Sequence, residues 1–105
     1  MKKTLHYKLV RDRIPEIITD AGKDFATRQL RGEDLIRFAL KKLREEVQEF
    51  VENPCAEEAA DIREILEFLC SRLAIGDSAI QAAQISKRVT RGSFDMGYLL
   101  EWVEE

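Results

Sequence analysis

The dipeptide Asn53-Pro54 separates two long amphipathic segments, and this feature most restricts what the chain can fold into. On both sides of it, apolar residues recur at steps of three or four, the spacing of a helix with one buried face. In residues 33–52 these are Ile36, Ala39, Leu40, Leu43, Val47 and Phe50, and in residues 55–75 they are Ala59, Ile62, Ile65, Leu66, Leu69 and Leu73. Because Pro54 breaks one helix and suits the first turn of the next, the short connection predicts two antiparallel helices packed as neighbours.

Glycine and proline residues mark the ends of the other expected helices. Asp12 is predicted to cap a short helix that has Pro15 in its first turn and ends at Gly22. Gly76 is predicted to end the second long helix, and a third long helix, capped by Asp77 or Ser78, is expected to run to residue 89.

Three short segments have an extended pattern. Residues 5–10 are expected to be extended, residues 25–30 to form a brief strand, and residues 98–103 to form a short C-terminal strand. No linker, internal repeat or low-complexity stretch divides the sequence. We therefore expect a single domain, residues 1–105, of mainly α class: an antiparallel helical hairpin or bundle with short terminal strands.

The charge balance argues against nucleic acid and membranes as partners. Lys and Arg total 17 against 20 Asp and Glu, a formal net charge of -3, so no general basic field exists to hold a polyanion. No apolar run follows Met1-Lys2-Lys3, and none approaches the roughly 18 residues of a membrane span. Cys55 and Cys70 lack the spacing of metal ligands or of a disulfide framework. We expect a cytoplasmic protein with reduced, structural cysteines.

A set of acidic residues flanks the predicted turn between the two long helices. At about 100° per residue, Glu46 lies near 60° and Glu49 near 120° from the centre of the apolar stripe of the first helix. On the second helix Glu58 lies near 40°, inside the apolar arc, and Asp61 near 100°. The same calculation turns Glu45, Glu57 and Glu64 away from the interface between the helices.

A glutamate directed into an apolar stripe is unfavourable unless a cation or a metal compensates its charge. One interpretation is that the helix dipole stabilises the charge of Glu58 in the first turn of its helix, or that Glu58 pairs with Lys42 or Arg72. The competing interpretation is a divalent cation. Oxygen ligands from carboxylates suit Mg²⁺, with Mn²⁺ as the alternative, and argue against zinc.

Basic residues cluster near both ends of the sequence. Cations beside a metal held by carboxylates are what a polyphosphate ligand requires, because they hold the phosphate oxygens that the metal leaves free. A preference of helix C-termini for Lys and Arg explains part of the second cluster equally well. The two clusters are Lys8, Arg11 and Arg13, and Lys87, Arg88 and Arg91.

Three blocks of the sequence resemble one protein family. Residues 8–18 (KLVRDRIPEII), residues 43–50 (LREEVQEF) followed by 58–62 (EAADI), and residues 91–94 (RGSF) occur in the order seen in MazG-like proteins. The chain is most similar to their phosphoribosyl-ATP pyrophosphohydrolase-like group. This resemblance implies the all-α nucleoside triphosphate pyrophosphohydrolase fold, and Mg²⁺-dependent cleavage of a nucleotide between its α- and β-phosphates to a monophosphate and pyrophosphate. It also implies a homodimer or homotetramer.

The resemblance assigns the metal ligands, and the mechanism that we expect gives roles to further side chains. By motif position, the metal ligands are Glu46, Glu49, Glu58 and Asp61. A carboxylate not fully used in coordination, Glu45 or Glu49, would orient or deprotonate the attacking water. The residues expected to hold the substrate phosphates are Lys8, Arg11, Lys42 and Arg91.

An alternative of a different class is a catalytically silent helical module that acts as an oligomeric scaffold or nucleotide sensor. Phe68 and Ile75, seven residues apart on the otherwise polar face of the second long helix, indicate a subunit contact. Acidic residues stand at all four expected ligand positions, which favours an enzyme over a catalytically silent module.

Overall fold

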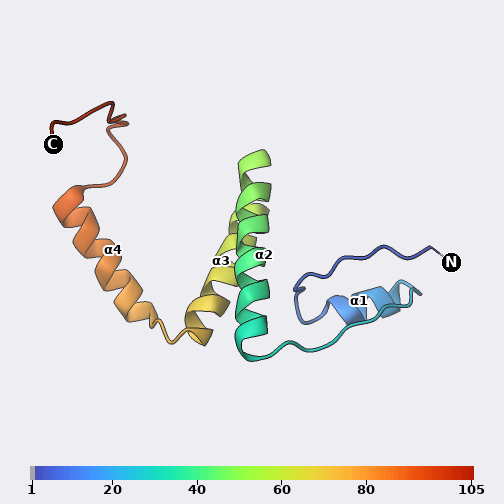
Figure 1. Ribbon diagram of the computed structural model, residues 1–105. Helices are drawn as coiled ribbons and strands as arrows, with labels where there is room; N and C mark the ends of the chain where they lie inside the picture. Colours follow the sequence, from blue (N-terminus) through green and yellow to red (C-terminus); the bar gives the residue numbers. More distant parts are fainter. Residues whose placement is uncertain (1) are drawn as a thin grey trace. The chain divides into compact units, whose positions relative to one another are not determined.

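The computed structural model describes residues 2–105 and contains, within that range, four helices and no strand. They are α1 (Ile14–Asp20), α2 (Gly32–Glu52), α3 (Ala56–Arg72) and α4 (Asp77–Arg91) (Figure 1). The predicted helical class is confirmed. The chain divides into two compact units, one ending at Leu73 and the other beginning at Ala74, and each is described by itself. The assignment of all 105 residues to one domain stays a prediction.

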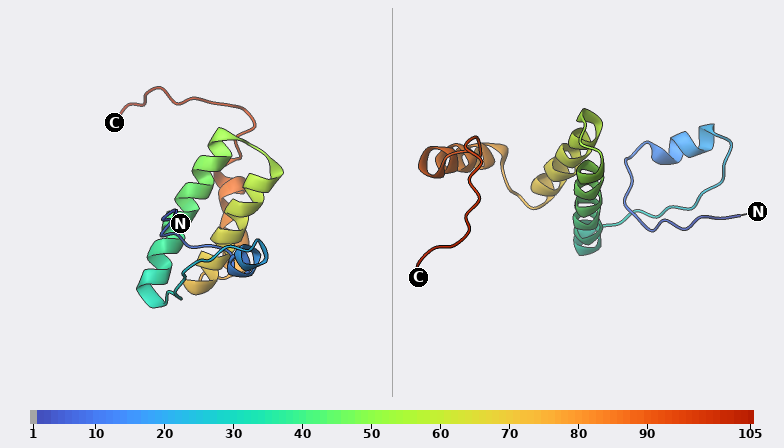
Figure 2. Two further views of the ribbon diagram at one scale, coloured as in Figure 1. Left: turned by 90° about the vertical axis from the view of Figure 1, so that its right-hand side faces the viewer. Right: turned by 90° about the horizontal axis from the view of Figure 1, so that it is seen from above.

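Helices α2 and α3 form the predicted antiparallel hairpin and lie side by side (Figures 1 and 2). The backbone N–H of Asn53 donates to the Glu49 carbonyl oxygen at 2.9 Å and closes α2, while Cys55 is extended and begins α3. Pro54 lies between them and has no N–H to continue the first helix. The two helices therefore reverse direction over a few residues, which brings the end of α2 beside the start of α3.

The core of the hairpin is small. Its buried apolar side chains, within the described residues, are Ala39, Ile65 and Leu69. The small Ala39 side chain permits close approach of the two helices. The half-buried side chains that pack around these three are Leu9, Ile36, Leu43 and Phe68. Phe68, for which a subunit contact was predicted, packs against the core of its own hairpin. The Arg72 guanidinium lies 5.2 Å from the centre of the Phe68 ring.

The end of α3 differs from the prediction. The helix stops at Arg72, and the residue with a left-handed backbone is Ala74, with φ +58°, instead of Gly76. Gly76 has φ -72° and precedes the first residue of α4, so its predicted role as the end of the second long helix is wrong. Helix α4 continues to Arg91, two residues beyond the predicted end, and Gly92, with φ +81°, follows it.

Replacing Ala74 with Gly is expected to stabilise the chain modestly. An alanine in the left-handed region is strained by about 1–2 kcal/mol, and relief of that strain outweighs the greater backbone freedom of glycine in the unfolded chain. Thermal denaturation followed by circular dichroism measures the change. As a control, Ala60→Gly in the exposed interior of α3 should instead destabilise by about 1 kcal/mol. Equal losses in both variants would contradict the assigned strain.

Helix α1 ends as predicted and begins differently. Gly22 has φ +75°, its N–H donates to Thr19 O at 2.9 Å, and the N–H of Lys23 donates to Ile18 O at 3.2 Å. These two bonds form a glycine-terminated helix end of the Schellman type. The predicted cap at Asp12 is wrong, because Arg13 precedes the first helical residue and no side chain caps it.

The predicted short strands do not form within residues 2–105. An isolated strand leaves its backbone groups unpaired, and these segments have no partner strand among the described residues. Tyr7, with φ +45°, also interrupts the extended backbone of residues 5–10. In residues 98–103 the apolar side chains remain exposed instead of covering a sheet.

None of the described helices is both long and apolar enough to cross a bilayer.

Candidate metal centre

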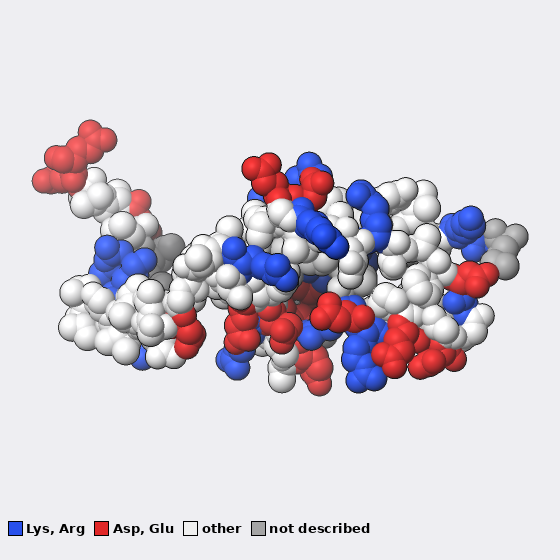
Figure 3. Space-filling model, turned by 90° about the horizontal axis from the view of Figure 1, so that it is seen from below, with Lys and Arg blue, Asp and Glu red and all other residues white. Residues whose placement is uncertain are grey.

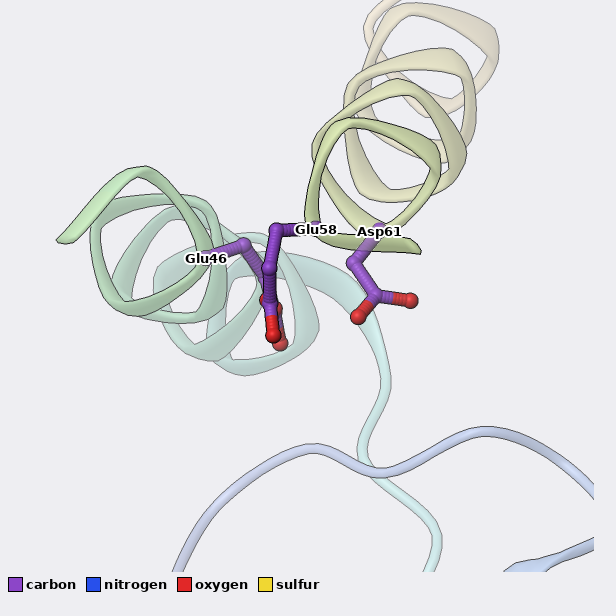
Figure 4. Close-up of side chains that lie close together, drawn as sticks. All are labelled: Glu46, Glu58 and Asp61. Carbon is purple, nitrogen blue, oxygen red and sulfur yellow. The ribbon is translucent and has the colours of Figure 1, made fainter. Parts of the chain in front are cut away.

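Three carboxylates gather where the end of α2 meets the start of α3. They belong to Glu46 on α2 and to Glu58 and Asp61 on α3, and one oxygen from each lies within 4.8 Å of the others. The three side chains point to the same side of the hairpin (Figure 4). The short turn at Asn53-Pro54 sets this arrangement, because it places residues before and after it at the same level of the two helices.

Glu46 is the buried member of the cluster. It is 7% exposed, in accord with its predicted position at the edge of the apolar stripe. The Lys42 ammonium, one helical turn earlier, lies 3.2 Å from Glu46 Oε1 and offsets its charge. Lys42 therefore pairs with Glu46, whereas the sequence left open a pair between Lys42 and Glu58.

Glu58 is the carboxylate without compensation. Its Oε2 atom is buried and has no hydrogen-bond partner among the described residues. Burial raises the pKa of Glu58 above its ordinary value, and the negative charges of Glu49, Asp61 and Glu46 raise it further. The structure contains neither a pair with Lys42 nor one with Arg72 in residues 2–105, and no side chain caps the start of α3.

Asp61 receives a cation from the N-terminal segment. The Arg11 guanidinium donates from Nη2 to Asp61 Oδ1 at 2.6 Å, and this hydrogen bond raises the pKa of Arg11. Both side chains are partly exposed, so the pair is screened by water and contributes little to stability. The pair instead holds the Arg11 guanidinium beside the cluster, where the Lys42 ammonium is the other cation. The intermingling of acidic and basic side chains is visible on the face drawn in Figure 3.

The other predicted site residues take different positions. Glu49 is exposed, and its charge acts on Glu58, but it lies outside the group of three. Glu45 is half-buried one residue before Glu46, on a different face of α2. Lys8 is exposed and forms no ion pair in the part of the chain that the structure describes. Arg91 is the last residue of α4, not a residue beyond it as predicted, and belongs to the second unit.

The pair between Arg11 and Asp61 is the feature of the site that sequence reasoning missed. Arg11 was expected to hold phosphate, and nothing in the sequence pattern linked it to Asp61. The two residues are 50 positions apart, so no helical spacing connects them. Only the packing of the N-terminal segment against the hairpin brings them together.

The donor set suits a hard divalent cation. Around Mg²⁺, with metal–oxygen distances near 2.0–2.1 Å, ligand oxygens are about 2.9 Å apart when adjacent and about 4.2 Å apart when opposite. The carboxylate oxygens, within 4.8 Å of one another, need only small side-chain movements to reach these separations. The buried, unpartnered Oε2 of Glu58 is the observation that indicates a cation here, because an uncompensated buried carboxylate oxygen is unfavourable.

Comparisons with protein-family models, with curated proteins and with solved structures find no match for this chain. The resemblance to MazG-like proteins therefore stays a prediction. It rests on the residues quoted for it, and the position of three of its four predicted metal ligands in one cluster is compatible with it.

The raised pKa of Glu58 predicts a distinctive pH dependence of stability in chelator-treated protein. Because the folded-state pKa lies above the ordinary value, the folded chain binds this proton more tightly than the unfolded chain. The free energy of unfolding should therefore rise as the pH falls through the raised pKa, and level off below the ordinary glutamate value.

Urea denaturation at a series of pH values measures this effect. Glu58→Gln should lose this component, so the difference between the two proteins should shrink as the pH falls. A difference that stays constant across the whole series would show that Glu58 titrates normally.

Proposed function

We propose that the chain is a Mg²⁺-dependent nucleotide pyrophosphohydrolase that cleaves between the α- and β-phosphates and releases a monophosphate and pyrophosphate. The observation that carries the proposal is the buried Glu58 oxygen without a partner, beside the carboxylates of Glu46 and Asp61. The family resemblance supplies the reaction. A cytoplasmic location, where nucleotides are abundant, belongs to the same proposal.

Glu46, Glu58 and Asp61 would hold the metal, with Glu49 as a fourth ligand after a change of rotamer. Mn²⁺ would be accepted by the same oxygen ligands. A bound Mg²⁺ supplies neutralisation of phosphate charge and a lowered pKa of bound water.

The protein's own cations complete the site. Arg11 and Lys42 already lie beside the cluster through their pairs with Asp61 and Glu46. If Asp61 and Glu46 held a metal, the side chains of Arg11 and Lys42 would be available to hold phosphate oxygens at short distance. Lys8 and Arg91 are proposed as further phosphate ligands on the sequence alone.

If coordination uses only part of its carboxylate, Glu49 suits the role of the base better than Glu45. It is exposed, so water reaches it, and its charge acts directly on Glu58. A base must lie within hydrogen-bond reach of the water that it activates. Glu45 faces another side of α2 and would need a larger rearrangement.

The direct test is product analysis with purified full-length protein. A panel of NTPs, dNTPs and phosphoribosyl-ATP is incubated with Mg²⁺, and in parallel with a chelator. We expect monophosphate and pyrophosphate in equal amounts, and no turnover with the chelator. The panel also identifies the substrate class.

Two outcomes would change the proposal. Orthophosphate as the product would show that a different bond is cut. Tight, Mg²⁺-dependent nucleotide binding without turnover would favour the nucleotide sensor.

A further inference from the structure

The N-terminal segment, residues 2–13, is tied to the hairpin through the acidic cluster itself. Within the described residues, the pair between Arg11 and Asp61 is the only hydrogen bond or salt bridge that joins residues 2–30 to α2 or α3. Leu9 adds an apolar contact, since it packs half-buried against the core of the hairpin. The docking of this segment therefore depends on a carboxylate that we expect to bind a metal.

Arg11 and a divalent cation would draw on the same negative charges. The hydrogen bond to Asp61 raises the pKa of Arg11, and the charges of Asp61, Glu64 and Glu46 raise it further. Two of these three carboxylates, those of Asp61 and Glu46, belong to the cluster. A divalent cation held there would repel the Arg11 guanidinium and weaken its attraction to both carboxylates. Binding of either cation therefore opposes binding of the other.

The two cations beside the cluster are held in different ways. Lys42 lies on α2 one helical turn before Glu46, so its side chain can turn away while the backbone stays in place. Arg11 belongs to an irregular segment and lies 50 positions from Asp61 along the chain. Loss of its pair would remove the polar contact of the whole segment and leave only the packing of Leu9.

We propose that the N-terminal segment responds to the metal: it is docked on the acidic cluster through Arg11 when the cluster is metal-free, and a divalent cation releases it. The observation that carries this proposal is the 2.6 Å contact from Arg11 Nη2 to Asp61 Oδ1, a carboxylate of the cluster. The inference rests on the metal site of the proposed function. It adds an order of events, in which Arg11 becomes free for phosphate only after the metal has bound.

The coupling is reciprocal, so Mg²⁺ affinity measures it. In titration calorimetry, Arg11→Gln should bind Mg²⁺ at least about threefold more tightly than the wild type, because the opposing charge is gone. The control Arg13→Gln removes the same charge two residues further along, from an exposed side chain that pairs with Glu16, and its affinity should stay within about twofold of the wild type. Circular dichroism establishes that both variants keep their helices.

Limited proteolysis follows the segment in the wild-type protein. Trypsin cleaves after Arg11, and this bond is protected while the guanidinium is docked. Compared with NaCl at the same ionic strength, Mg²⁺ should speed this cleavage at least about twofold. Cleavage after Arg91, the exposed last residue of α4 in the second unit, is the internal reference. An unchanged ratio of the two cleavages would overturn the release of the segment.

The outcomes separate this inference from the metal centre on which it rests. Equal Mg²⁺ affinity in the wild type and Arg11→Gln would leave the metal centre in place and overturn the competition with Arg11. Equally tighter binding by Arg11→Gln and Arg13→Gln would also overturn it, because the general charge of the segment would then explain the change. Absence of Mg²⁺ binding in all three proteins would overturn the metal centre and the docking switch together.

Discussion

Glu58→Gln is expected to lower Mg²⁺-dependent hydrolysis by at least about 100-fold while the metal-free fold stays at least as stable as the wild type. Replacing the carboxylate with an amide removes one negatively charged ligand from the centre of the cluster. It also removes the repulsion from Glu49, Asp61 and Glu46 that raises the pKa of the carboxyl group. Turnover assays and thermal denaturation with a chelator measure these two quantities, and Mg²⁺ titration calorimetry measures the Mg²⁺ affinity, which should also fall.

Glu57→Gln is the matched control, because Glu57 is the preceding residue on α3, is exposed and lies outside the cluster. It removes the same charge from the same helical turn, and turnover should stay within about twofold of the wild type. Equal losses in both variants would point to the general negative charge of the turn. Full Mg²⁺ affinity in Glu58→Gln would remove Glu58 from the ligand set.

Leu69→Ala is expected to reduce the free energy of unfolding by about 3 kcal/mol and the Tm by roughly 10–20 °C. Leu69 is almost fully buried in a core whose other buried apolar side chains, within the described residues, are Ala39 and Ile65. Because the core is so small, few neighbouring side chains can move into the cavity that the substitution leaves. Urea and thermal denaturation at low protein concentration measure the loss.

Leu66→Ala gives the comparison on the same helix with the same chemical change. Its side chain is 46% exposed, so the variant should lose less than half as much stability as Leu69→Ala. Similar losses at both positions would mean that a second layer covers Leu66 in solution. A negligible loss at Leu69 would contradict the hairpin core.

The sequence predicts the hairpin well because its determinants are local. The period of the apolar residues and the break at Pro54 belong to neighbouring positions, and α2 begins and ends within one residue of its expected bounds. The end of α3 was missed because a glycine was expected to take the left-handed backbone that Ala74 adopts. Residue preference alone gives no reason to expect an alanine in that conformation.

The candidate site shows the same division between local and distant determinants. Helical angles predict that Glu46, Glu49, Glu58 and Asp61 converge, and the structure brings Glu46, Glu58 and Asp61 together, because a short turn joins their two helices. The helical angles do not show whether Lys42 pairs with Glu46 or with Glu58, since both carboxylates lie near it. The contact between Arg11 and Asp61 depends on the path of an irregular segment, and sequence periodicity gives no information about such a path.

The short connection between α2 and α3 has a consequence for the order of folding. Contacts that are close in sequence form faster than distant ones, because less chain entropy is lost when the loop closes. The cluster spans only residues 46–61, so its carboxylates meet as soon as the hairpin closes, and Lys42 on the same helix neutralises Glu46 from the start. Arg11, 50 positions from Asp61, arrives later. We therefore expect the acidic cluster to assemble first and the N-terminal segment to dock onto negative charge that is already in place.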